Sequence, residues 1–262
     1  MSTATSRFNR LGLVGVVTLI YGFLLLPVVI VVVTSFTTQS FPGIPKNGIS
    51  FQWYEQLLAD SKLVNSLRVS VVVATCSSIL SALVGTVAAF GFVRSDFPYK
   101  EQISSVMLLP MVISPIITGI ALVRYFGTLS VPSGYPALIV GHTVLTLPYV
   151  FLLVRSELVT FDRDLERASR TLGADSTLTF LNITGPIISP AILSGMFVAF
   201  VVSFGEFAAT QFLIAPGTST VPVVIYTMLR TGLTPTINAL ATLLIVVMVT
   251  VAFASRYFDP SN

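Results

Sequence analysis

The stretch from Leu11 to Phe36 reads LGLVGVVTLIYGFLLLPVVIVVVTSF and contains no charged residue. A helix crosses the hydrocarbon of a bilayer in about 20 residues, so this stretch is long enough to span a membrane. It is also far longer than the apolar core of a secretory signal peptide, which has about 7–15 residues, and no small-residue cleavage pattern follows it. We therefore expect a retained first span, preceded by Arg7 and Arg10.

The composition of the whole chain agrees with a membrane protein. Of its 262 residues 54% are hydrophobic and 10% are charged, whereas about 25% of the residues of a soluble domain are charged. The net charge of +3 comes from basic residues that lie between apolar runs, so we expect no nucleic-acid partner. A single cysteine, Cys76, excludes an intrachain disulfide and a cysteine metal cluster, and we expect no metal site and no cofactor.

The same test, applied along the chain, predicts an all-α, polytopic fold. Prolines, glycines and serines trim the uncharged intervals at turns. Six transmembrane helices are then expected near 12–35, 64–93, 103–126, 137–155, 187–212 and 237–256. The stretch 214–236 is rich in proline, glycine, serine and threonine, and we expect it to be mainly loop.

Lysines and arginines predict the direction of the spans, because they are enriched in cytoplasmic loops. With the N-terminus inside, nine basic residues lie in the cytoplasm, namely Arg7, Arg10, Arg94, Lys100, Arg155, Arg163, Arg167, Arg170 and Arg256. Three lie outside, namely Lys46, Lys62 and Arg230. We therefore expect both termini in the cytoplasm.

The loop at 155–185 is the most charged of those expected inside, and its apolar residues have the spacing of one helix face. They are Leu158, Phe161, Leu165, Ala168 and Leu172. Gly173 should end this helix, and Asp175 can cap a second short helix over 176–184. Two interpretations remain open at this point: an amphipathic helix on the bilayer surface, or a docking element for a cytoplasmic partner.

The segment LERASRTLGA (165–174), followed by Ile183 and Pro186, resembles the "EAA" loop of binding-protein-dependent ABC importer permeases. The spacing from Gly173 to Pro186 is that of the family. Two positions depart from its pattern: Arg167 stands where the family has glutamate, with Glu166 one residue earlier, and Gly185 replaces the usual leucine before the proline.

The resemblance implies a type I importer fold and a coupling helix that sits in a groove of an ATPase subunit. The residues implied for this contact are Glu166, Arg167, Ala168, Leu172, Gly173 and Ala174. It also implies two ATPase subunits, a second homologous permease and an extracytoplasmic solute-binding protein as partners, in a prokaryotic plasma (inner) membrane. Residues 1–57 would be an N-terminal helix with an external loop, and 58–256 a five-helix permease core with the coupling loop 155–185.

Other segments resemble the spermidine/putrescine-type permeases within that family. They are Phe51-Gln52-Trp53-Tyr54, Ile225-Tyr226 and the run TPTINALAT at 234–242. The resemblance implies a polyamine substrate or another small solute such as thiamine, ferric ion or phosphonate. The implied mechanism is alternating access, driven by ATP in the partner subunits.

The chain itself has no phosphate-binding loop of the form Gly-x-x-x-x-Gly-Lys-Ser/Thr. Its lysines, Lys46, Lys62 and Lys100, are followed by Asn47, Leu63 and Glu101. We therefore expect it not to be an enzyme and ATP hydrolysis to occur in a separate subunit. The alternatives are a self-contained secondary transporter, for which Glu206 would be the only coupling-ion residue, and a membrane-embedded enzyme, for which the sequence supplies no catalytic pair.

Glu206 is the only acidic residue placed deep in an expected span, and a charge there costs about 2.5–3.5 kcal/mol on insertion scales. It either lines the translocation path, together with Phe204 and Tyr226, or holds helices together as a hydrogen-bonded acid. His142 is the only histidine, and we expect it to have a structural role as a hydrogen-bonding side chain.

Overall fold

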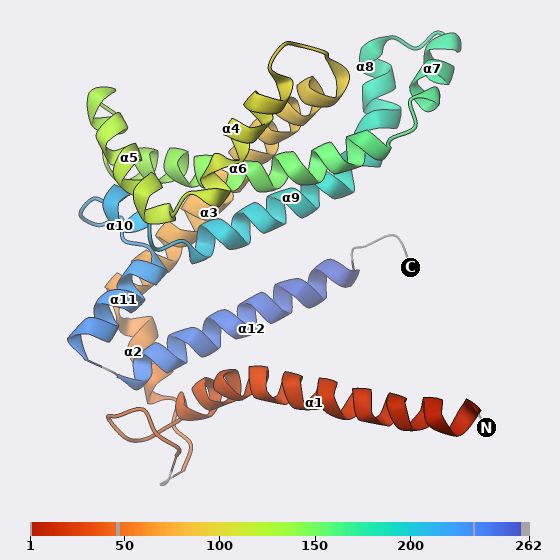
Figure 1. Cartoon of the computed structure of the whole chain (residues 1–262). Coiled ribbons are helices and arrows are strands. Elements are labelled where there is room, and N and C mark those ends of the chain that lie inside the picture. Colours follow the sequence, from red (N-terminus) through yellow and green to blue (C-terminus); the bar gives the residue numbers. More distant parts are fainter. Residues whose placement is uncertain (1, 46–47, 233, 258–262) are drawn as a thin grey trace. The chain divides into compact units, whose positions relative to one another are not determined.

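The computed structural model of the protein describes residues 2–45, 48–232 and 234–257. Throughout these ranges the regular secondary structure is helical, so the predicted fold class is confirmed (Figure 1). The helices are α1 (Ser2–Thr34), α2 (Gln52–Ala59), α3 (Ser61–Arg94), α4 (Lys100–Val112), α5 (Pro115–Thr128), α6 (Tyr135–Thr160), α7 (Asp164–Thr171), α8 (Ser176–Thr179), the π-helix η1 (Phe180–Thr184), α9 (Gly185–Gly205), α10 (Thr210–Leu213), α11 (Val221–Thr231) and α12 (Pro235–Tyr257).

The chain forms two compact units. The first comprises Met1–Val64 and Ile225–Asn262, and the second comprises Asn65–Val224. These units are defined by contacts within the chain. The expected boundary between an N-terminal helix with its external loop (1–57) and a permease core (58–256) is a different division, and it stays a prediction.

In the first unit, α2 and the segment before it secure the end of α1. Trp53 Nε1 donates a hydrogen bond to the carbonyl oxygen of Thr37 at 2.6 Å, and the hydroxyls of Tyr54 and Ser35 lie 2.7 Å apart. Helix α12 packs against α1 and α2, and Asn238 Nδ2 donates to Thr34 Oγ1 at 2.9 Å. The segment Phe51–Tyr54, noted in the sequence, therefore has a packing role here.

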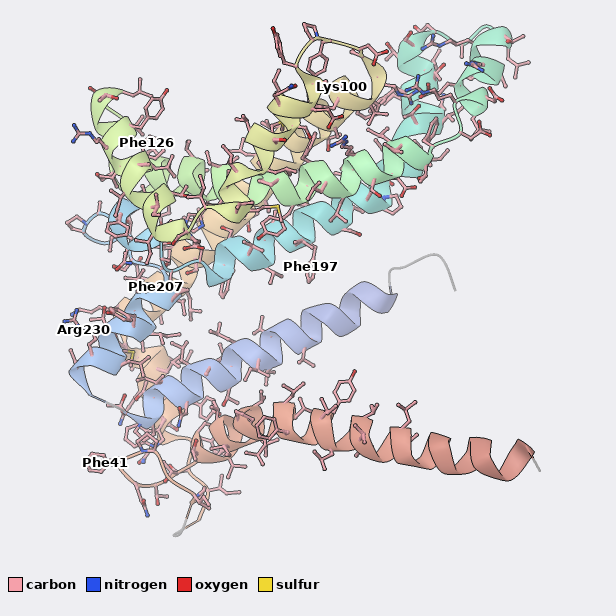
Figure 2. The ribbon with its side chains drawn as sticks, viewed as in Figure 1. Phe41, Lys100, Phe126, Phe197, Phe207 and Arg230 are labelled. Atoms are coloured by element: carbon pink, nitrogen blue, oxygen red, sulfur yellow. The ribbon has the colours of Figure 1, made fainter. Side chains whose placement is uncertain are left out.

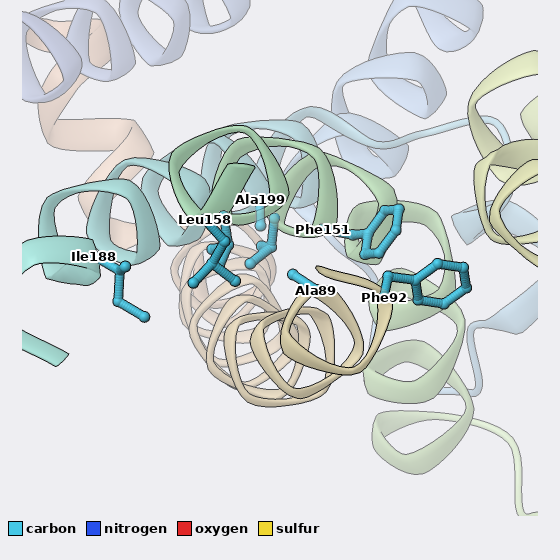
Figure 3. Packing of buried hydrophobic residues seen from close by; sticks show 8 residues of the cluster. Ala89, Phe92, Phe151, Leu158, Ile188 and Ala199 are labelled. Carbon is cyan, nitrogen blue, oxygen red and sulfur yellow. The ribbon is translucent and has the colours of Figure 1, made fainter. Parts of the chain in front are cut away.

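In the second unit, α6 and α9 form the main helix pair, and α3 completes its core. A close approach is possible because Gly195 has no side chain: a Cβ there would lie 3.1 Å from Val150 Cα. The core side chains shown in Figure 3 come from α3, α6 and α9. They include Phe92 and Phe151, whose rings meet edge to face at 5.2 Å.

Four helices of the described residues are long and apolar enough to cross a membrane: Leu13–Thr34, Ser61–Arg94, Tyr135–Thr160 and Ser176–Gly205. A fifth span results if α4 and α5 are counted as one. Helix α1 shows the reason for the assignment most clearly, since Leu19 and Phe23 are both 73% exposed and would face lipid. The six-span count stays a prediction, with α12 as the remaining expected span.

The expected third span, 103–126, is broken. Helices α4 and α5 meet at an angle of 108°. The break falls at Ile113 and Ser114, both with extended ψ values, directly before Pro115 at the start of α5. A residue before proline is disfavoured in the helical conformation, and proline is well accepted in a first turn. Pro115 therefore favours a sharp corner within the segment expected to form one continuous span.

The stretch 214–236 is not mainly loop, contrary to the expectation. It contains α11, an eleven-residue helix. Pro222 stands in the first turn of α11, where its missing N–H has no intrahelical partner in any case. The loop prediction counted this proline as a helix breaker without regard to its position.

Candidate functional site

The predicted coupling loop is divided by a break that its apolar spacing did not show. Helix α6 ends at Thr160, Phe161 is extended with ψ 128°, and α7 begins at Asp164. Leu158 and Phe161 are buried, whereas Leu172 is 89% exposed. The single apolar helix face expected from 158 to 172 is therefore wrong: its first two residues belong to the core, and the last one faces away from it.

The end of α7 and the start of α8 follow the predicted chemistry. Gly173 adopts φ +92°, a left-handed conformation that glycine accepts without strain. Asp175 caps α8, since its Oδ1 accepts a hydrogen bond from the backbone N–H of Leu178 at 2.7 Å. The turn at Gly173 and the cap at Asp175 are confirmed, but the capped helix is not the short one expected over 176–184, because it continues to Gly205. The corner at Gly173 turns the chain from α7 into the long helix that enters the membrane.

That long helix contains a π-turn close to its start. η1 follows α8 directly and leads into α9, so Ser176–Gly205 is one candidate span. The N–H of Gly185 donates to the carbonyl oxygen of Phe180, five residues back. Pro186 has no N–H and its ring crowds the carbonyl one turn back, which explains a widened turn at this point.

Glu166 ties α7 to the ends of two membrane helices. Its Oε1 accepts a hydrogen bond from Arg94 Nη2 at 2.6 Å and another from Thr184 Oγ1 at 2.5 Å. Arg94 is the last residue of α3, and Thr184 ends η1 just before α9. The Glu166 side chain is only 15% exposed. One carboxylate oxygen thus links three helices at this end of the second unit.

The other residues predicted for the ATPase contact lie on the outside of the loop. Arg167, Ala168, Leu172 and Gly173 are exposed, and Ala174 is partly so. Arg167 pairs with Asp164 at 2.8 Å, one helical turn away. The structure therefore separates Glu166, which points inward, from the other five, which form an exposed surface at the tip of the loop.

A hollow of about 490 Å³ lies beside Glu166. Its lining combines four arginines, one acid, three hydroxyl residues and two aromatic rings: Phe90, Arg94, Arg163, Glu166, Arg167, Arg170, Ser176, Thr179, Phe180 and Thr184. Sequence reasoning missed Arg94, Thr184 and the aromatic residues as members of this site. The available signal was the charge of Arg94 at a span end, but its partner lies 72 residues away.

The second candidate region surrounds Glu206, where the expected helix 187–212 is broken. Helix α9 ends at Gly205, and α10 starts at Thr210. Oε1 of Glu206 accepts a hydrogen bond from the Ala209 N–H at 2.8 Å, and Thr210 Oγ1 donates to the Glu206 carbonyl at the same distance. The residue therefore stabilises the irregular turn that interrupts the helix. Irregular backbone at membrane depth is tolerated only where protein or a water-filled cavity surrounds it.

His142 bridges this break from α6. It is buried, its Nδ1 lies 2.7 Å from Ser203 Oγ in the last turn of α9, and its Nε2 lies 3.0 Å from Thr210 Oγ1. Ser77 of α3 extends the network, with its hydroxyl 2.9 Å from that of Ser203. The predicted structural role of His142 is confirmed.

The remaining path residues lie in different units. Phe204 precedes Glu206 closely on α9 and stacks on Phe200 at 5.9 Å between ring centroids. Tyr226, on α11, belongs to the first unit and is 44% exposed, and its ring centroid lies 5.9 Å from the Arg230 guanidinium carbon. Phe197 also stands out from α9 (Figure 2) and is 44% exposed.

Within the described ranges no group of three or more His, Cys, Asp or Glu residues could hold a metal ion.

Comparison with known proteins assigns the family. The model of the "Binding-protein-dependent transport system inner membrane component" family matches residues 81–261. The putrescine transport system permease protein PotI of Escherichia coli (strain K12) is 32% identical over 244 residues, which cover 90% of this chain and 86% of PotI. The spermidine/putrescine transport system permease protein PotC of Haemophilus influenzae is 28% identical over 243 residues, with 93% and 94% covered.

A solved structure shares the fold. It belongs to a bacterial ABC transporter involved in the import of the acidic polysaccharide alginate, with a TM-score of 0.75, 14% identity and 99% of both chains covered. The predicted resemblance to ABC importer permeases is thereby confirmed. This chain belongs to the family of binding-protein-dependent transport system inner membrane components.

Proposed function

We propose that the chain forms half of the translocation path of a polyamine importer, and that ATPase subunits drive it through the loop 155–185. The observation that carries this proposal is the link from α7 to α3 and η1 through Glu166. The similarity to putrescine and spermidine/putrescine permeases, which extends over about nine tenths of the chain, supports a polyamine as the solute.

The exposed surface of the loop is the proposed contact with the ATPase. Ala168, Leu172 and Gly173 present small and apolar groups that fit a groove, with Ala174 beside them and Arg167 available for an acidic partner. An apolar side chain as exposed as Leu172 is the kind that a partner surface covers.

Glu166 acts in this proposal as a positioning residue. When the ATPase moves α7, the hydrogen bonds of Glu166 pull on Arg94 at the end of α3 and on Thr184 at the start of α9. Movement of α9 then reaches Glu206 at its other end. Two ATPase subunits, a second homologous permease and an extracytoplasmic binding protein complete the transporter, and alternating access follows ATP binding and hydrolysis.

The membrane topology in this proposal has six spans, with both termini in the cytoplasm and a permease core from 58 to 256. The arginines around α7 support this direction, since Arg94, Arg163, Arg167 and Arg170 gather at one end of the second unit.

Glu206 is the proposed contact for the ammonium groups of the solute. One of its oxygens accepts from the Ala209 N–H, and a carboxylate has further lone pairs that can accept from an ammonium group. A charged carboxylate at membrane depth is stabilised by facing a water-filled path. Phe204 and Tyr226 are proposed as aromatic neighbours of that path.

The test is co-purification followed by an activity assay. The tagged chain is isolated in mild detergent, and a P-loop ATPase and a second permease should be recovered with it. The complex, reconstituted with its binding protein, should hydrolyse ATP faster with putrescine than without it, and molybdate should have no effect. Uptake of putrescine by the isolated chain without ATP would contradict the proposal and indicate a secondary transporter.

A further inference from the structure

We propose that the basic hollow beside α7, defined by Arg94, Arg163, Arg167 and Arg170, binds the phosphate headgroup of an anionic phospholipid. This site shares Arg167 with the proposed ATPase contact, whereas the other residues of that contact, Ala168, Leu172, Gly173 and Ala174, do not line the hollow. The site is separate from the solute path around Glu206, which lies at the opposite end of α9.

The charge of the hollow is incompletely neutralised. Glu166 pairs with Arg94, and Asp164 pairs with Arg167. Arg163 donates one hydrogen bond to a backbone carbonyl, that of Val93, at 2.9 Å, and its positive charge has no counterion among the described residues. The Arg170 guanidinium makes no hydrogen bond or ion pair with any residue that the structure describes, although the backbone carbonyl of Arg170 accepts from the Gly173 N–H at 3.0 Å. Two guanidinium groups with free donors thus line a cavity that can hold an anion, and arginine suits phosphate because its planar fork can donate two parallel hydrogen bonds.

Hydroxyl groups in the hollow supply further hydrogen-bond donors for a phosphate. Ser176 stands at the start of α8 and lines the hollow, and its hydroxyl has no hydrogen-bond partner among the described residues. A phosphate oxygen can accept from it. The Thr179 hydroxyl, by contrast, already donates to the Asp175 carbonyl at 2.8 Å.

The depth of the hollow matches the headgroup layer. Ser176–Gly205 has 30 residues and a length of about 45 Å, against about 30 Å of hydrocarbon. Ser61–Arg94 has 34 residues and a length of about 51 Å. Both helices therefore extend beyond the hydrocarbon. The ends that line the hollow, with Arg94 on one helix and the hydroxyls of Ser176 and Thr179 on the other, belong at the level of the lipid phosphates. Basic pockets between membrane helices are known to take anionic headgroups.

The membrane side of the hollow is apolar. The rings of Phe90 and Phe180 meet edge to face at 5.6 Å and form part of its lining. Phe180 is 42% exposed, and the next residue, Leu181, is 62% exposed. A phospholipid with its phosphate between Arg163 and Arg170 can place its acyl chains against these apolar side chains. The carboxylate of an acidic protein side chain has no apolar group of that length to pack against them.

The experiment is native mass spectrometry of the full chain, released from bilayers of equal parts phosphatidylglycerol and phosphatidylcholine. The wild type should retain phosphatidylglycerol in preference to phosphatidylcholine. The double variant Arg163→Gln, Arg170→Gln should lose this preference, by roughly fivefold for each arginine and about 25-fold for both. The double variant Arg163→Lys, Arg170→Lys should keep most of the preference for phosphatidylglycerol, because both positive charges remain. Arg124→Gln removes an exposed arginine of α5 that does not line the hollow, and it should leave the preference for phosphatidylglycerol unchanged.

Three results would overturn the proposal. The first is equal retention of phosphatidylglycerol by the double glutamine variant and the wild type. The second is binding of inorganic phosphate, at millimolar concentration, by the lipid-free chain with no preference for phosphatidylglycerol, which would indicate a site for soluble anions. The third is loss of phosphatidylglycerol from the wild type when the ATPase subunit binds, which would assign the arginines to a protein interface. None of these measurements depends on transport, so their outcome is independent of the proposed solute and energy source.

Discussion

Arg94 Nη2 lies 2.6 Å from Glu166 Oε1 and joins the last residue of α3 to the first turns of α7, with the two side chains 22% and 15% exposed. A charge-assisted hydrogen bond of this kind is shorter and stronger than a neutral one. Since Thr184 donates to the same oxygen, a movement of α7 cannot occur without stretching contacts to both α3 and η1. The pair is therefore a direct side-chain connection between the loop and the membrane helices in the second unit, beside the hydrogen bond from Arg163 to the Val93 carbonyl.

Replacing Glu166 by alanine should uncouple the transporter. Loss of hydrogen bonds to a charged group costs about 1.5–3 kcal/mol, and α7 loses its side-chain bonds to Arg94 and Thr184, while the Arg163 bond to the Val93 carbonyl remains. Putrescine-stimulated ATPase activity of the assembled complex should fall to the basal rate, while assembly itself persists. Asp164→Asn is the matched control, because the Asp164–Arg167 pair is 76% and 77% exposed and such pairs contribute about 0–1 kcal/mol. Full stimulation in the Glu166→Ala complex would contradict the role of the link.

Gly173 should tolerate no side chain without strain, although the space around it is open. Its φ of +92° is left-handed, and this backbone conformation costs roughly 1–2 kcal/mol of conformational free energy for a residue with a Cβ. Gly173→Ala should therefore loosen the corner between α7 and α8 and increase protease cleavage of the loop. Gly91→Ala is the control, since Gly91 also has open space but lies in the helix α3; it should be neutral or stabilising. Equal cleavage of both variants would show that the corner is not strained.

Gly119 should be sensitive to size. A Cβ at this position would lie 2.7 Å from Ala209 Cα, so α5 packs directly on the turn that follows Glu206. Gly119→Val should cost about 1–3 kcal/mol through overpacking and lower the thermal unfolding midpoint of the detergent-solubilised chain. Gly127→Val, on the same helix with nothing within 4 Å, should have little effect. A Gly119→Val midpoint equal to that of Gly127→Val would place α5 farther from this turn.

His142 should be required for stability. His142→Ala removes the ring's hydrogen bonds to the hydroxyls of Ser203 and Thr210, at about 0.5–1.5 kcal/mol for each bond, although Ser77 and the Glu206 carbonyl remain as partners of these hydroxyls. The unfolding midpoint should fall clearly below that of Thr118→Ala, which removes an exposed hydroxyl bonded only within α5. A wild-type midpoint for His142→Ala would mean that water replaces the ring in the network.

Substitutions of Glu206 can separate its two possible roles. Glutamine keeps an oxygen that accepts from the Ala209 N–H but removes the negative charge. If Glu206 contacts the solute, Glu206→Gln should fold normally and import putrescine at least about tenfold more slowly, a loss of about 1.4 kcal/mol. Glu206→Ala should lose both import and stability. Normal putrescine import by Glu206→Gln would leave the residue with a structural role alone.

The elements that depend on local chemistry could be predicted. Residues 11–36 contain no charge, and a helix is the one form in which a single segment satisfies its backbone in lipid, so α1 followed from composition. The turn at Gly173 and the cap at Asp175 also followed, because a left-handed glycine and a capping carboxylate act within four residues of themselves. The same local rules treated Pro222 as a helix breaker and did not foresee the corner before Pro115, since the effect of a proline depends on its place in the helix.

The sequence by itself determined that this is a helical membrane protein with a charged loop of the importer-permease type. Apolar length, charge and motif spacing are properties of neighbouring residues, and they need no knowledge of what packs against what. Only the tertiary structure decided that Glu166 faces Arg94 and Thr184, that Leu158 and Phe161 belong to the core, and that α9 stops at Glu206 with His142 across the break. These depend on contacts between residues 18 to 72 positions apart, where the direction of each side chain follows from the packing of whole helices.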